Sequence, residues 1–298
     1  MSKIHGFKGE TAFRVINGLF MFILAGITLY PLLYVVFGSF SDPAKLSQFR
    51  GALLKPIGFS LKGYEAVFSM KNFWLGYRNT LFYVMAGTAI SMLLTILGAY
   101  ALSVKGYMLK KPIMFLIVFT MYFNGGMIPT YLVIRQVGFV DTIWSVLIPG
   151  CISVYNLIVL RSSFQSIPRN LIESASIDGA GHIRILFRIV LPLSSAALAT
   201  ITLFYGASRW GAWYSAMVYL PNRRDLYPLQ MFLRELMVTE NNMDAVADEF
   251  STESANFYLL KNVIKYAAVI VSTVPILCLY PFLQKYFMKG VLVGSLKE

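Results

Sequence analysis

The sequence predicts an all-α protein that crosses a membrane several times. Hydrophobic residues make up 57% of its 298 residues and charged residues only 13%, and its mean hydropathy is +0.64. Soluble globular chains carry about 25% charged residues. A helix needs about 20 mainly apolar residues to cross a hydrocarbon core about 30 Å thick, and several such runs occur here. We therefore expect residues 1–298 to form a single transmembrane domain.

Apolar runs bounded by charged residues, glycine or proline predict six membrane-spanning helices. The first run is longer than the core of a signal peptide and lacks a small-x-small cleavage site after it, so we expect it to remain as a helix. Gly87 and Ser91, four residues apart in the second run, would let another helix approach closely. The six predicted spans cover residues 15–37, 80–102, 112–134, 143–160, 193–216 and 263–283.

The positions of lysine and arginine predict that both termini face the cytoplasm, because positively charged loops stay on that side of the membrane. In this orientation the segment 163–192 and the cytoplasmic tail 284–298 are inside and rich in basic residues. The outer loop 218–262 carries more carboxylates than cations. Cytoplasmic flanks then account for the net charge of +12, and we expect no nucleic-acid partner.

The sequence lacks the motifs of an ATPase or of a membrane-embedded enzyme. No Gly-Lys dipeptide occurs, so a P-loop for nucleotide phosphates is absent. His5 and His182 lie outside the apolar runs and far apart in sequence, whereas Cys151 and Cys278 lie inside such runs. These positions indicate no catalytic or metal-binding cluster. We expect a non-catalytic chain with no catalytic residues, no metal and no cofactor of its own.

The polar segment between the fourth and fifth runs predicts two short helices joined by a turn. Pro168 suits the first turn of a helix, and Ser166 suits the cap before it. Gly179 gives the backbone the freedom to end this helix and turn the chain. Its apolar face is formed by Leu171, Ile172 and Ala175, which recur at helical spacing.

A second short helix is expected over residues 181–190. Pro192 follows it and is expected to open the fifth apolar run. Two short helices at an angle would make a compact knob on the cytoplasmic side. The apolar face of the second helix is predicted to consist of Ile183, Leu186, Phe187 and Val190.

This segment resembles the cytoplasmic signature of the membrane permease subunits of bacterial binding-protein-dependent ABC importers. That signature reads Glu-Ala-Ala, three residues, glycine, nine residues, Ile-x-Leu-Pro. This chain departs from the signature at one position, where Ser174 replaces the first alanine. The resemblance implies a coupling loop over residues 163–192 that docks into a groove of a separate ATPase. Its coupling residues would be Glu173, Ser174, Ala175, Asp178, Gly179, Ile189, Leu191 and Pro192.

The resemblance extends over nearly the whole chain and is closest to carbohydrate permeases of the maltose-transporter second-subunit type. It implies a place in the bacterial cytoplasmic (inner) membrane and a sugar substrate, most simply an oligosaccharide. The implied partners are a second permease subunit, two ATPase subunits that bind ATP and Mg, an extracytoplasmic solute-binding protein and the lipid bilayer. The outer loop 218–262 would contact the binding protein, and the tail 284–298 would reach between the ATPase subunits. The branch serving complex oligosaccharides is suggested by residues 123–132, 141–150, 225–235 and 285–297.

An arginine and several aromatic residues in and after the fifth run are candidates for the sugar pathway. Arg209 could reach the membrane interface or line a wet cavity, and in a cavity it would favour an acidic sugar such as a uronate oligosaccharide. Trp213 and Tyr214 could bind sugar rings or belong to an interfacial aromatic belt. The full set of candidates is Arg209, Trp210, Trp213, Tyr214 and Asn124.

Two alternative functions remain. One is an ABC permease for peptides or another polar solute. The other, from a different class, is a non-ABC channel or a membrane scaffold, neither of which needs a coupling segment. A stoichiometric ATPase that copurifies with the chain would separate the second alternative from a permease.

Overall fold

The computed structural model describes residues 8–104, 106, 108–238 and 260–278. Within these residues the chain is almost entirely helical, with one isolated antiparallel bridge between Ser41 and Phe59. The predicted all-α class is therefore confirmed for the part of the chain that the structure describes. The chain divides into two compact units, of which one takes in Met1–Met70 and Leu236–Thr273 and the other Lys71–Glu235 and Val274–Glu298.

The first unit packs short helices against the last described helix, Leu260–Cys278. A small core of Leu46, Leu53 and Val263 holds these segments together. Its long first helix is apolar, and none of its apolar window is buried within the chain, as expected of a helix surrounded by lipid. This long first helix is α1 (Lys8–Ser39). The two short helices of the unit are α2 (Pro43–Gln48) and α3 (Lys62–Ser69).

Two glycines let the backbone approach helix Leu260–Cys278 closely. A Cβ added at Gly63 would lie 2.5 Å from Cγ1 of Val263, and one added at Gly38 would lie 2.7 Å from Cδ2 of Tyr266. Both distances are too short for a real side chain. Glycine at these positions is thus required by packing.

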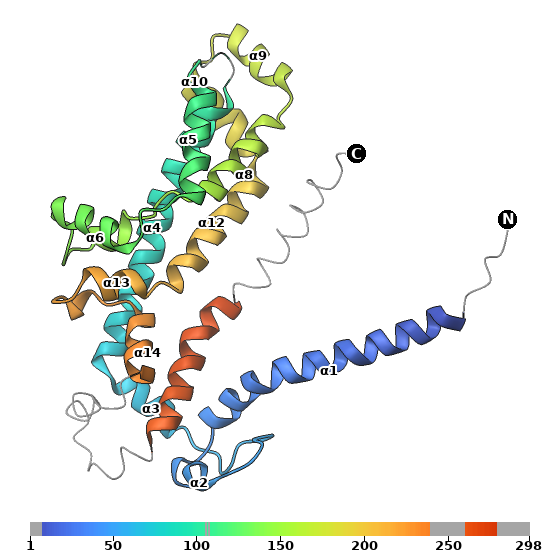
Figure 1. Cartoon of the computed structure of the whole chain (residues 1–298), viewed down its shortest axis with the longest axis vertical. Coiled ribbons are helices and arrows are strands. Elements are labelled where there is room, and N and C mark those ends of the chain that lie inside the picture. Colours follow the sequence, from blue (N-terminus) through green and yellow to red (C-terminus); the bar gives the residue numbers. More distant parts are fainter. Residues whose placement is uncertain (1–7, 105, 107, 239–259, 279–298) are drawn as a thin grey trace. The chain divides into compact units, whose positions relative to one another are not determined.

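The second unit is built on three helices that lie side by side, α4 (Lys71–Ser103), α8 (Val154–Gln165) and α12 (Ser195–Trp210) (Figure 1). At one end of these helices lie α9 (Arg169–Ile177) and α10 (His182–Ile185). The remaining elements are α5 (Lys110–Tyr122), α6 (Met127–Gln136), α7 (Trp144–Leu147), η1 (Leu186–Val190), α11 (Leu191–Leu193), α13 (Tyr214–Tyr219), η2 (Arg224–Leu226) and α14 (Leu229–Val238).

Two apolar clusters form the core of the second unit. The smaller cluster joins the middle of α4 to α7 and α13 through Tyr83, Leu147 and Leu220. The larger cluster joins α4, α8 and α12 to the segment that contains α10 and η1. Its buried members are Ala99, Leu160, Phe164, Ile167, Ile185, Leu186, Val190, Ile201 and Tyr205. The helix-turn-helix at the end of the unit is therefore anchored in the same core as the long helices.

Three described helices are long and apolar enough to cross a membrane, and the number rises to five if each of two bent helix pairs counts as one span. The three straight helices overlap the first, second and sixth predicted spans. The last of these spans continues beyond the described residues, as do the tail 284–298 and part of the outer loop 218–262. The straight helices are Phe13–Ser39, Lys71–Ser103 and Leu260–Cys278.

The other three predicted spans are not continuous helices, so the expectation of unbroken helices there was wrong. Over 112–134, α5 and α6 meet at 117°. Over 143–160, α7 ends at Leu147 and α8 begins at Val154. Over 193–216, α12 ends at Trp210.

Glycine turns explain two of these breaks. Gly126 before α6 has φ +86°, and Gly150 between α7 and α8 has φ +67°. Such left-handed backbone is easy for glycine and ends a helix. Hydropathy measures how well a segment tolerates an apolar environment, and it does not report whether the backbone stays helical.

Gly76 gives the first testable prediction, because a Cβ there would lie 3.2 Å from Cα of Leu229 and 3.3 Å from its nitrogen. Backbone atoms move less easily than the end of a side chain. We expect Gly76→Val to lower the free energy of unfolding by about 1–3 kcal/mol through overpacking. Thermal unfolding of the detergent-purified chain measures the change. The matched control is Gly206→Val in α12, where the nearest atom to an added Cβ is Oγ1 of Thr88 at 4.0 Å; equal losses would contradict the packing argument.

Candidate functional site

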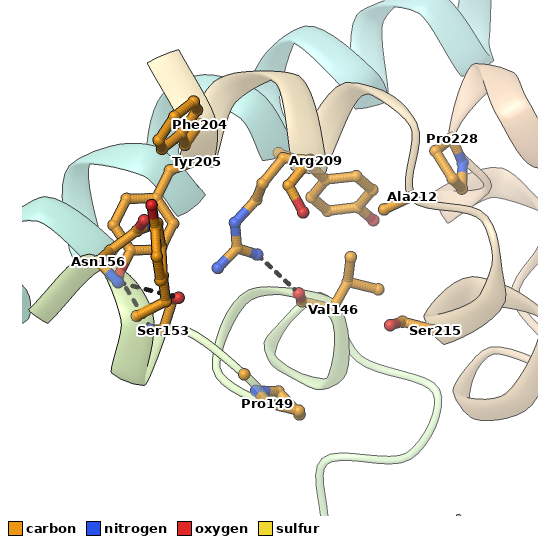
Figure 2. Close-up of a pocket in the computed structure, with 14 residues that line it drawn as sticks. Val146, Pro149, Ser153, Asn156, Phe204, Tyr205, Arg209, Ala212, Ser215 and Pro228 are labelled. Atoms are coloured by element: carbon orange, nitrogen blue, oxygen red, sulfur yellow. Dashed lines mark hydrogen bonds between the residues drawn. The ribbon is translucent and has the colours of Figure 1, made fainter. Parts of the chain in front are cut away.

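The break between α7 and α8 leaves backbone groups without helical partners inside an apolar run. At membrane depth such groups must be bonded by protein or face a wet cavity, since lipid offers them no hydrogen bonds. Arg209 of α12 supplies the bonds at the end of α7. Its Nη1 donates to the carbonyl oxygen of Val146 at 3.0 Å (Figure 2), and its Nη2 donates to that of Leu147 at 3.0 Å. A cation at the C-terminus of a helix also suits the helix dipole.

Small residues of α4 make room for this side chain. A Cβ at Gly87 would lie 2.6 Å from Nε of Arg209, and the Oγ of Ser91 accepts a hydrogen bond of 3.2 Å from Nη2. The pair that the sequence marked for close approach of another helix thus receives the arginine. Arg209 thus bridges α12 to α4 and α7.

Tyr205, one turn before Arg209, fixes the start of α8. Its hydroxyl accepts a hydrogen bond of 3.0 Å from the backbone nitrogen of Ser153 and lies 2.8 Å from Oγ1 of Thr95 on α4. The Oγ of Ser153 in turn caps α8 by accepting from the nitrogen of Asn156 at 3.3 Å. Both edges of the break are therefore held by side chains of α12.

A cavity of about 410 Å³ lies between the broken segment and α12. Figure 2 shows Arg209, Ser153, Asn156 and Ser215 around it. Its volume falls within the range of about 300–1,000 Å³ that is usual for small-ligand sites. None of its lining residues is a carboxylate, so the arginine charge is not neutralised within the cavity. The polar side chains that line it are Tyr83, Ser153, Tyr155, Asn156, Tyr205, Ser208, Arg209 and Ser215.

Of the five residues proposed for a sugar pathway, Arg209 is the one that lines this cavity. Trp210 is buried, and its ring packs edge-on against Tyr77 with ring centres 5.8 Å apart. Asn124 accepts a hydrogen bond of 2.9 Å from the nitrogen of Gly126 and so stabilises the turn between α5 and α6.

The other two candidates lie beyond the end of α12. The ring of Trp213 has the guanidinium of Arg234 5.0 Å from its centre, a cation–π contact. The hydroxyl of Tyr214 lies 2.6 Å from the sulfur of Met127. Cavity-lining residues such as Ser153 and Asn156 were missed because single serine and asparagine residues carry no signal until the break places them together.

The first helix of the coupling segment ends in a Schellman motif. Gly179 adopts φ +78°, and its nitrogen donates to the oxygen of Ser176 at 3.1 Å, while the nitrogen of Ala180 donates to that of Ala175 at 2.9 Å. These two bonds are the pair that defines the motif, and its central position favours glycine. The prediction that Gly179 ends the helix is confirmed.

The start of this helix differs from the prediction. Pro168 occupies the position before the first helical residue of α9 and provides no side-chain cap. Ser166 instead ends α8, and its hydroxyl donates to the oxygen of Ser163 at 2.7 Å. A serine between two adjacent helices can serve either end, and here the bond to the preceding turn is the one formed.

The second helix is longer than predicted and contains a π-turn. It runs through α10, η1 and α11 to Leu193, then meets α12 at 84°. Pro192 therefore lies in its last turn and does not open the next helix. A proline cannot donate to the carbonyl four residues earlier, and a π-turn relieves that conflict; here the nitrogen of Leu191 donates five residues back to the oxygen of Leu186.

The buried face of this second helix is also shifted. Of the four residues predicted to share an apolar face, Leu186 and Val190 are buried, together with Ile185. Ile183 and Phe187, which were expected on the same face, are 76% and 60% exposed. The π-turn over Leu186–Val190 changes the angular position of the residues that follow its start. Ile183 lies before this turn, where α10 packs on the core through Ile185.

Most residues of the coupling signature are exposed. Glu173, Ser174, Asp178 and Gly179 are accessible, and so is Pro192. Ala175 and Leu191 are half-buried and pack against the larger core cluster, and Ile189 is half-buried as well. The signature thus combines an accessible polar edge with an anchored apolar side.

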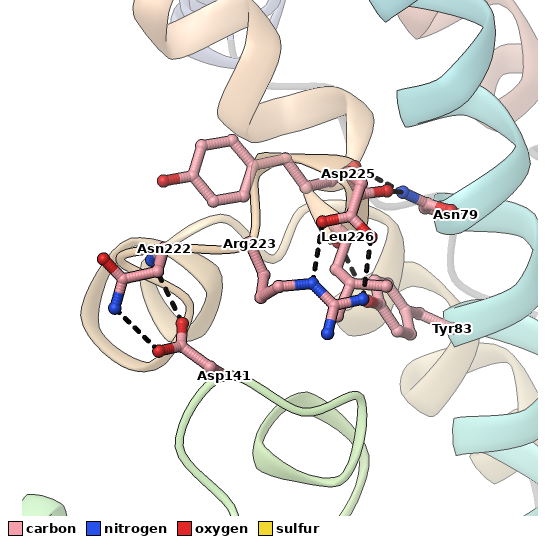
Figure 3. Close-up of polar contacts among 8 residues, drawn as sticks. Asn79, Tyr83, Asp141, Asn222, Arg223, Asp225 and Leu226 are labelled. Carbon is pink, nitrogen blue, oxygen red and sulfur yellow. Dashed lines mark hydrogen bonds and ion pairs between the residues drawn. The ribbon is translucent and has the colours of Figure 1, made fainter.

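At the other end of α4, a polar network holds the first part of the predicted outer loop. Asn79 donates to the carbonyl oxygens of Asp225 at 2.7 Å and Tyr227 at 3.1 Å, and the hydroxyl of Tyr83 donates to that of Leu226 at 2.8 Å (Figure 3). Through a bidentate contact of 2.9 and 2.8 Å, the Arg223 guanidinium lowers the pKa of the Asp225 carboxyl.

The same network reaches the loop before α7. Both carboxylate oxygens of Asp141 accept hydrogen bonds from Asn222, one from its backbone nitrogen at 3.0 Å and one from its Nδ2 at 2.9 Å (Figure 3). Asp141 itself has φ +59°. Because exposed ion pairs such as Arg223–Asp225 contribute little to stability, the buried amide and phenol donors of α4 carry most of the connection.

These features define a class of protein: a helical membrane protein whose broken helices enclose a polar cavity and whose exposed helix-turn-helix is fixed to the same core. Residues 96–293 match the model of the family described as binding-protein-dependent transport system inner membrane component. The chain belongs to this family. The matched region includes the coupling segment and every lining residue of the cavity except Tyr83.

Two proteins of Bacillus subtilis (strain 168) are similar along nearly their full length. The polygalacturonan/rhamnogalacturonan transport system permease protein YtcP is 40% identical over 278 residues, which cover 93% of this chain and 96% of YtcP. Protein LplC is 38% identical over 298 residues, which cover 99% of this chain and 98% of LplC.

A solved structure shares the fold and much of the sequence. It is a chain of a bacterial ABC transporter involved in the import of the acidic polysaccharide alginate, with a TM-score of 0.87 and 33% sequence identity. The match covers 96% of this chain and 100% of that chain.

Arg209 gives the second prediction. Arg209→Met leaves the carbonyls of Val146 and Leu147 without their donor, and each unpaired buried carbonyl costs about 1–3 kcal/mol. We expect a clear loss of thermal stability in detergent. Ser91→Ala is the control, because it removes a single bond of Arg209 and should cost about 0.5–1.5 kcal/mol. If both variants unfold at the same temperature, the guanidinium does not hold α7.

Proposed function

We propose that this chain is a permease subunit of an ABC importer for an oligosaccharide, and that it forms half of the translocation pathway. The observation that carries the proposal is the coupling segment, an exposed polar edge on a knob anchored in the helical core. Membership of the binding-protein-dependent family supports it, as do relatives named for saccharide transport. A peptide permease, a non-ABC channel and a membrane scaffold are not favoured, since none of them accounts for these relatives.

The whole chain would lie in the bacterial inner membrane as one permease domain with six passes and both termini in the cytoplasm. One of the passes is then the bent pair of α5 and α6, and another is α12, which follows the cytoplasmic segment His182–Leu193. A third is the broken pair α7 and α8. The basic coupling segment faces the cytoplasm and the Asn79 network faces outward, in agreement with the charge distribution.

The partner ATPase subunits would bind ATP and Mg and carry out hydrolysis, so that this chain is not catalytic. In this proposal α9 lies in a groove of one ATPase subunit. Glu173 makes a charged contact there, and Ala175 and Gly179 permit close approach. ATP-driven closure of the ATPase pair then opens the pathway outward, and hydrolysis opens it inward. A second permease subunit completes the pathway.

An extracytoplasmic binding protein would deliver the sugar to the outer loop 218–262. The Asn79 network supports this idea because it fixes residues 225–227 against α4. A rigid platform loses little conformational freedom when a partner binds. Residues 239–259 of this loop and the tail 284–298 lie outside the described residues, and their contacts stay predictions.

The cavity charge supports an acidic oligosaccharide as substrate. Arg209 lines a cavity without a lining carboxylate, and an unneutralised cation in a partly desolvated site attracts anions more strongly than it would in water. Two terminal nitrogens of Arg209 are engaged by carbonyls, so its role is mainly electrostatic. The tyrosines of the lining can contact sugar rings.

The coupling proposal is tested by reversing the charge of Glu173. Glu173 is exposed, so Glu173→Lys should insert and fold normally but lose substrate-stimulated ATP hydrolysis and uptake in the assembled importer. The matched control is Glu65→Lys, an exposed glutamate in the first turn of α3. Wild-type coupling in Glu173→Lys would refute a docking role for this residue.

The substrate proposal is tested with one oligosaccharide in two forms, the uronate and its carboxyl-reduced neutral form. We expect Arg209→Gln to lower the ratio of acidic to neutral uptake by about ten-fold, a plausible share of a charge–charge interaction at short range. Arg209→Lys, which keeps the charge, should retain most of the preference. The ratio is internally normalised, so reduced stability of the variants does not affect it. An unchanged ratio in Arg209→Gln would show that this charge does not select the substrate.

A further inference from the structure

A second cavity, of about 430 Å³, lies beneath the coupling segment. Its walls come from the C-terminal end of α4, the start of α5, the end of α8, and helices α9 and α10. The apolar part of the wall includes Phe164, Ile167 and Ile185, which belong to the larger core cluster. The cavity is therefore built into the folded core and is separate from the one that Arg209 lines.

Basic side chains gather at the rim of this cavity. Lys110 and Arg169 line it together with His182, and Glu173 is the single carboxylate among its lining residues. None of the three basic residues takes part in an ion pair in the part of the chain that the structure describes. The cavity thus carries an excess of positive charge.

Two cations near the rim are held in place by the end of α4. Nζ of Lys110 donates to the carbonyl oxygens of Ser103 at 3.3 Å and Val104 at 3.5 Å. Nε of Arg161 donates to that of Leu102 at 3.1 Å. Cations at these free carbonyls suit the helix dipole. They also fix the two side chains, so that little conformational entropy is lost when a ligand binds.

The anchoring leaves donors unused. An ammonium group has three N–H bonds and a guanidinium has five. Lys110 uses two of its N–H groups on carbonyl oxygens of α4, so one is left for a ligand. Arg161 uses only its Nε, so its terminal N–H groups are left. Tyr100 closes one wall, where its hydroxyl lies 3.2 Å from the oxygen of His182 and 3.4 Å from its Nδ1. Among the charged side chains that line the cavity, the donors Lys110 and Arg169 outnumber the single carboxylate of Glu173. Charged donors of this kind suit the oxygens of an anion such as phosphate.

We propose that this cavity binds a phosphate group, carried either by an anionic phospholipid of the inner leaflet or by a soluble phosphate ester. The anchored ammonium of Lys110 and the guanidinium of Arg169, both of which line the cavity, suit phosphate oxygens. Basic pockets between helices on the cytoplasmic side of a membrane are suited to lipid head groups. The cytoplasmic position rests on the orientation in the proposed function, whereas the cavity and its charge do not.

A bound phosphate here would touch the coupling helix. Glu173, Ile172 and Ser176 of α9 line the cavity on one side and Lys110 on the other. Occupancy would neutralise repulsion among the basic residues and hold α9 against the end of α4. The site would thus stabilise the position of the coupling helix before any ATPase docks.

The experiment is a binding titration on the full chain purified in a nonionic detergent, which requires no partner subunit. The probe is short-chain phosphatidylglycerol followed by calorimetry, with short-chain phosphatidylcholine as the neutral comparison. Lys110→Gln and Arg169→Gln should each weaken phosphatidylglycerol binding about five-fold and together about thirty-fold. The matched control is Lys111→Gln, whose exposed side chain does not line the cavity and should change binding less than two-fold.

Competition distinguishes the two sources of the phosphate. If glycerol 3-phosphate and inorganic phosphate fail to displace the lipid, the ligand is a phospholipid; if they displace it fully, the ligand is a soluble phosphate ester, and either result supports the site. Arg169→Gln keeps the test valid even if Lys110→Gln misfolds, because Arg169 is exposed. Unchanged binding in Arg169→Gln, or an equal loss in Lys111→Gln, would overturn the proposal. A loss of coupling in Glu173→Lys with intact phosphate binding would leave the two proposals independent.

Discussion

The need to satisfy backbone polar groups at membrane depth governs the second unit of this chain. The α7–α8 break exposes carbonyls that would be bonded in a continuous helix, and lipid cannot replace those bonds. Arg209 bonds the oxygens of Val146 and Leu147, and Tyr205 bonds the nitrogen of Ser153. An arginine is suited to this task because its guanidinium is always ionised and donates in several directions at once.

The same bonds explain why a charged cavity can exist among apolar helices. Burying an arginine without partners is costly, and here carbonyl dipoles stabilise the cation without cancelling its charge. A carboxylate partner would have neutralised it. The structure therefore keeps a net positive charge beside the cavity, which is what attraction of an acidic substrate requires. Gly87 and Ser91 contribute by giving the side chain a path between α4 and α12.

The sequence predicted local structure correctly where a residue type favours one backbone conformation, as glycine does at the end of a helix. Gly179 and the spacing from Glu173 to Pro192 indicated a helix-turn-helix and a partner, and the Schellman motif forms at the expected glycine. The breaks in three predicted spans could not be seen from hydropathy, because apolar composition is the same for a straight and a broken helix. The role of Arg209 depends on carbonyls of another helix, Val146 and Leu147, which no local pattern identifies.

The sequence also failed to predict which side chains of the second coupling helix are buried. Pro192 removes a hydrogen bond from a regular helix, and the chain responds with a π-turn over Leu186–Val190. Faces calculated at 3.6 residues per turn do not hold beyond the start of this π-turn. Ile183 lies before the turn and is exposed because α10 packs on the core through Ile185. Pro192 therefore helps to determine the geometry of the second coupling helix, in whose last turn it lies.

The coupling segment and the cavity that Arg209 lines share one packed core. Ile185, Leu186 and Val190 of the coupling segment lie in the same cluster as Leu160 of α8 and Tyr205 of α12, and Tyr205 also lines the cavity and holds the start of α8. Close-packed side chains resist small independent displacements. In the proposed function, this shared core is the route by which a displacement of the coupling segment would reach α12. Tyr205 would pass it on to the start of α8, because its hydroxyl bonds the nitrogen of Ser153.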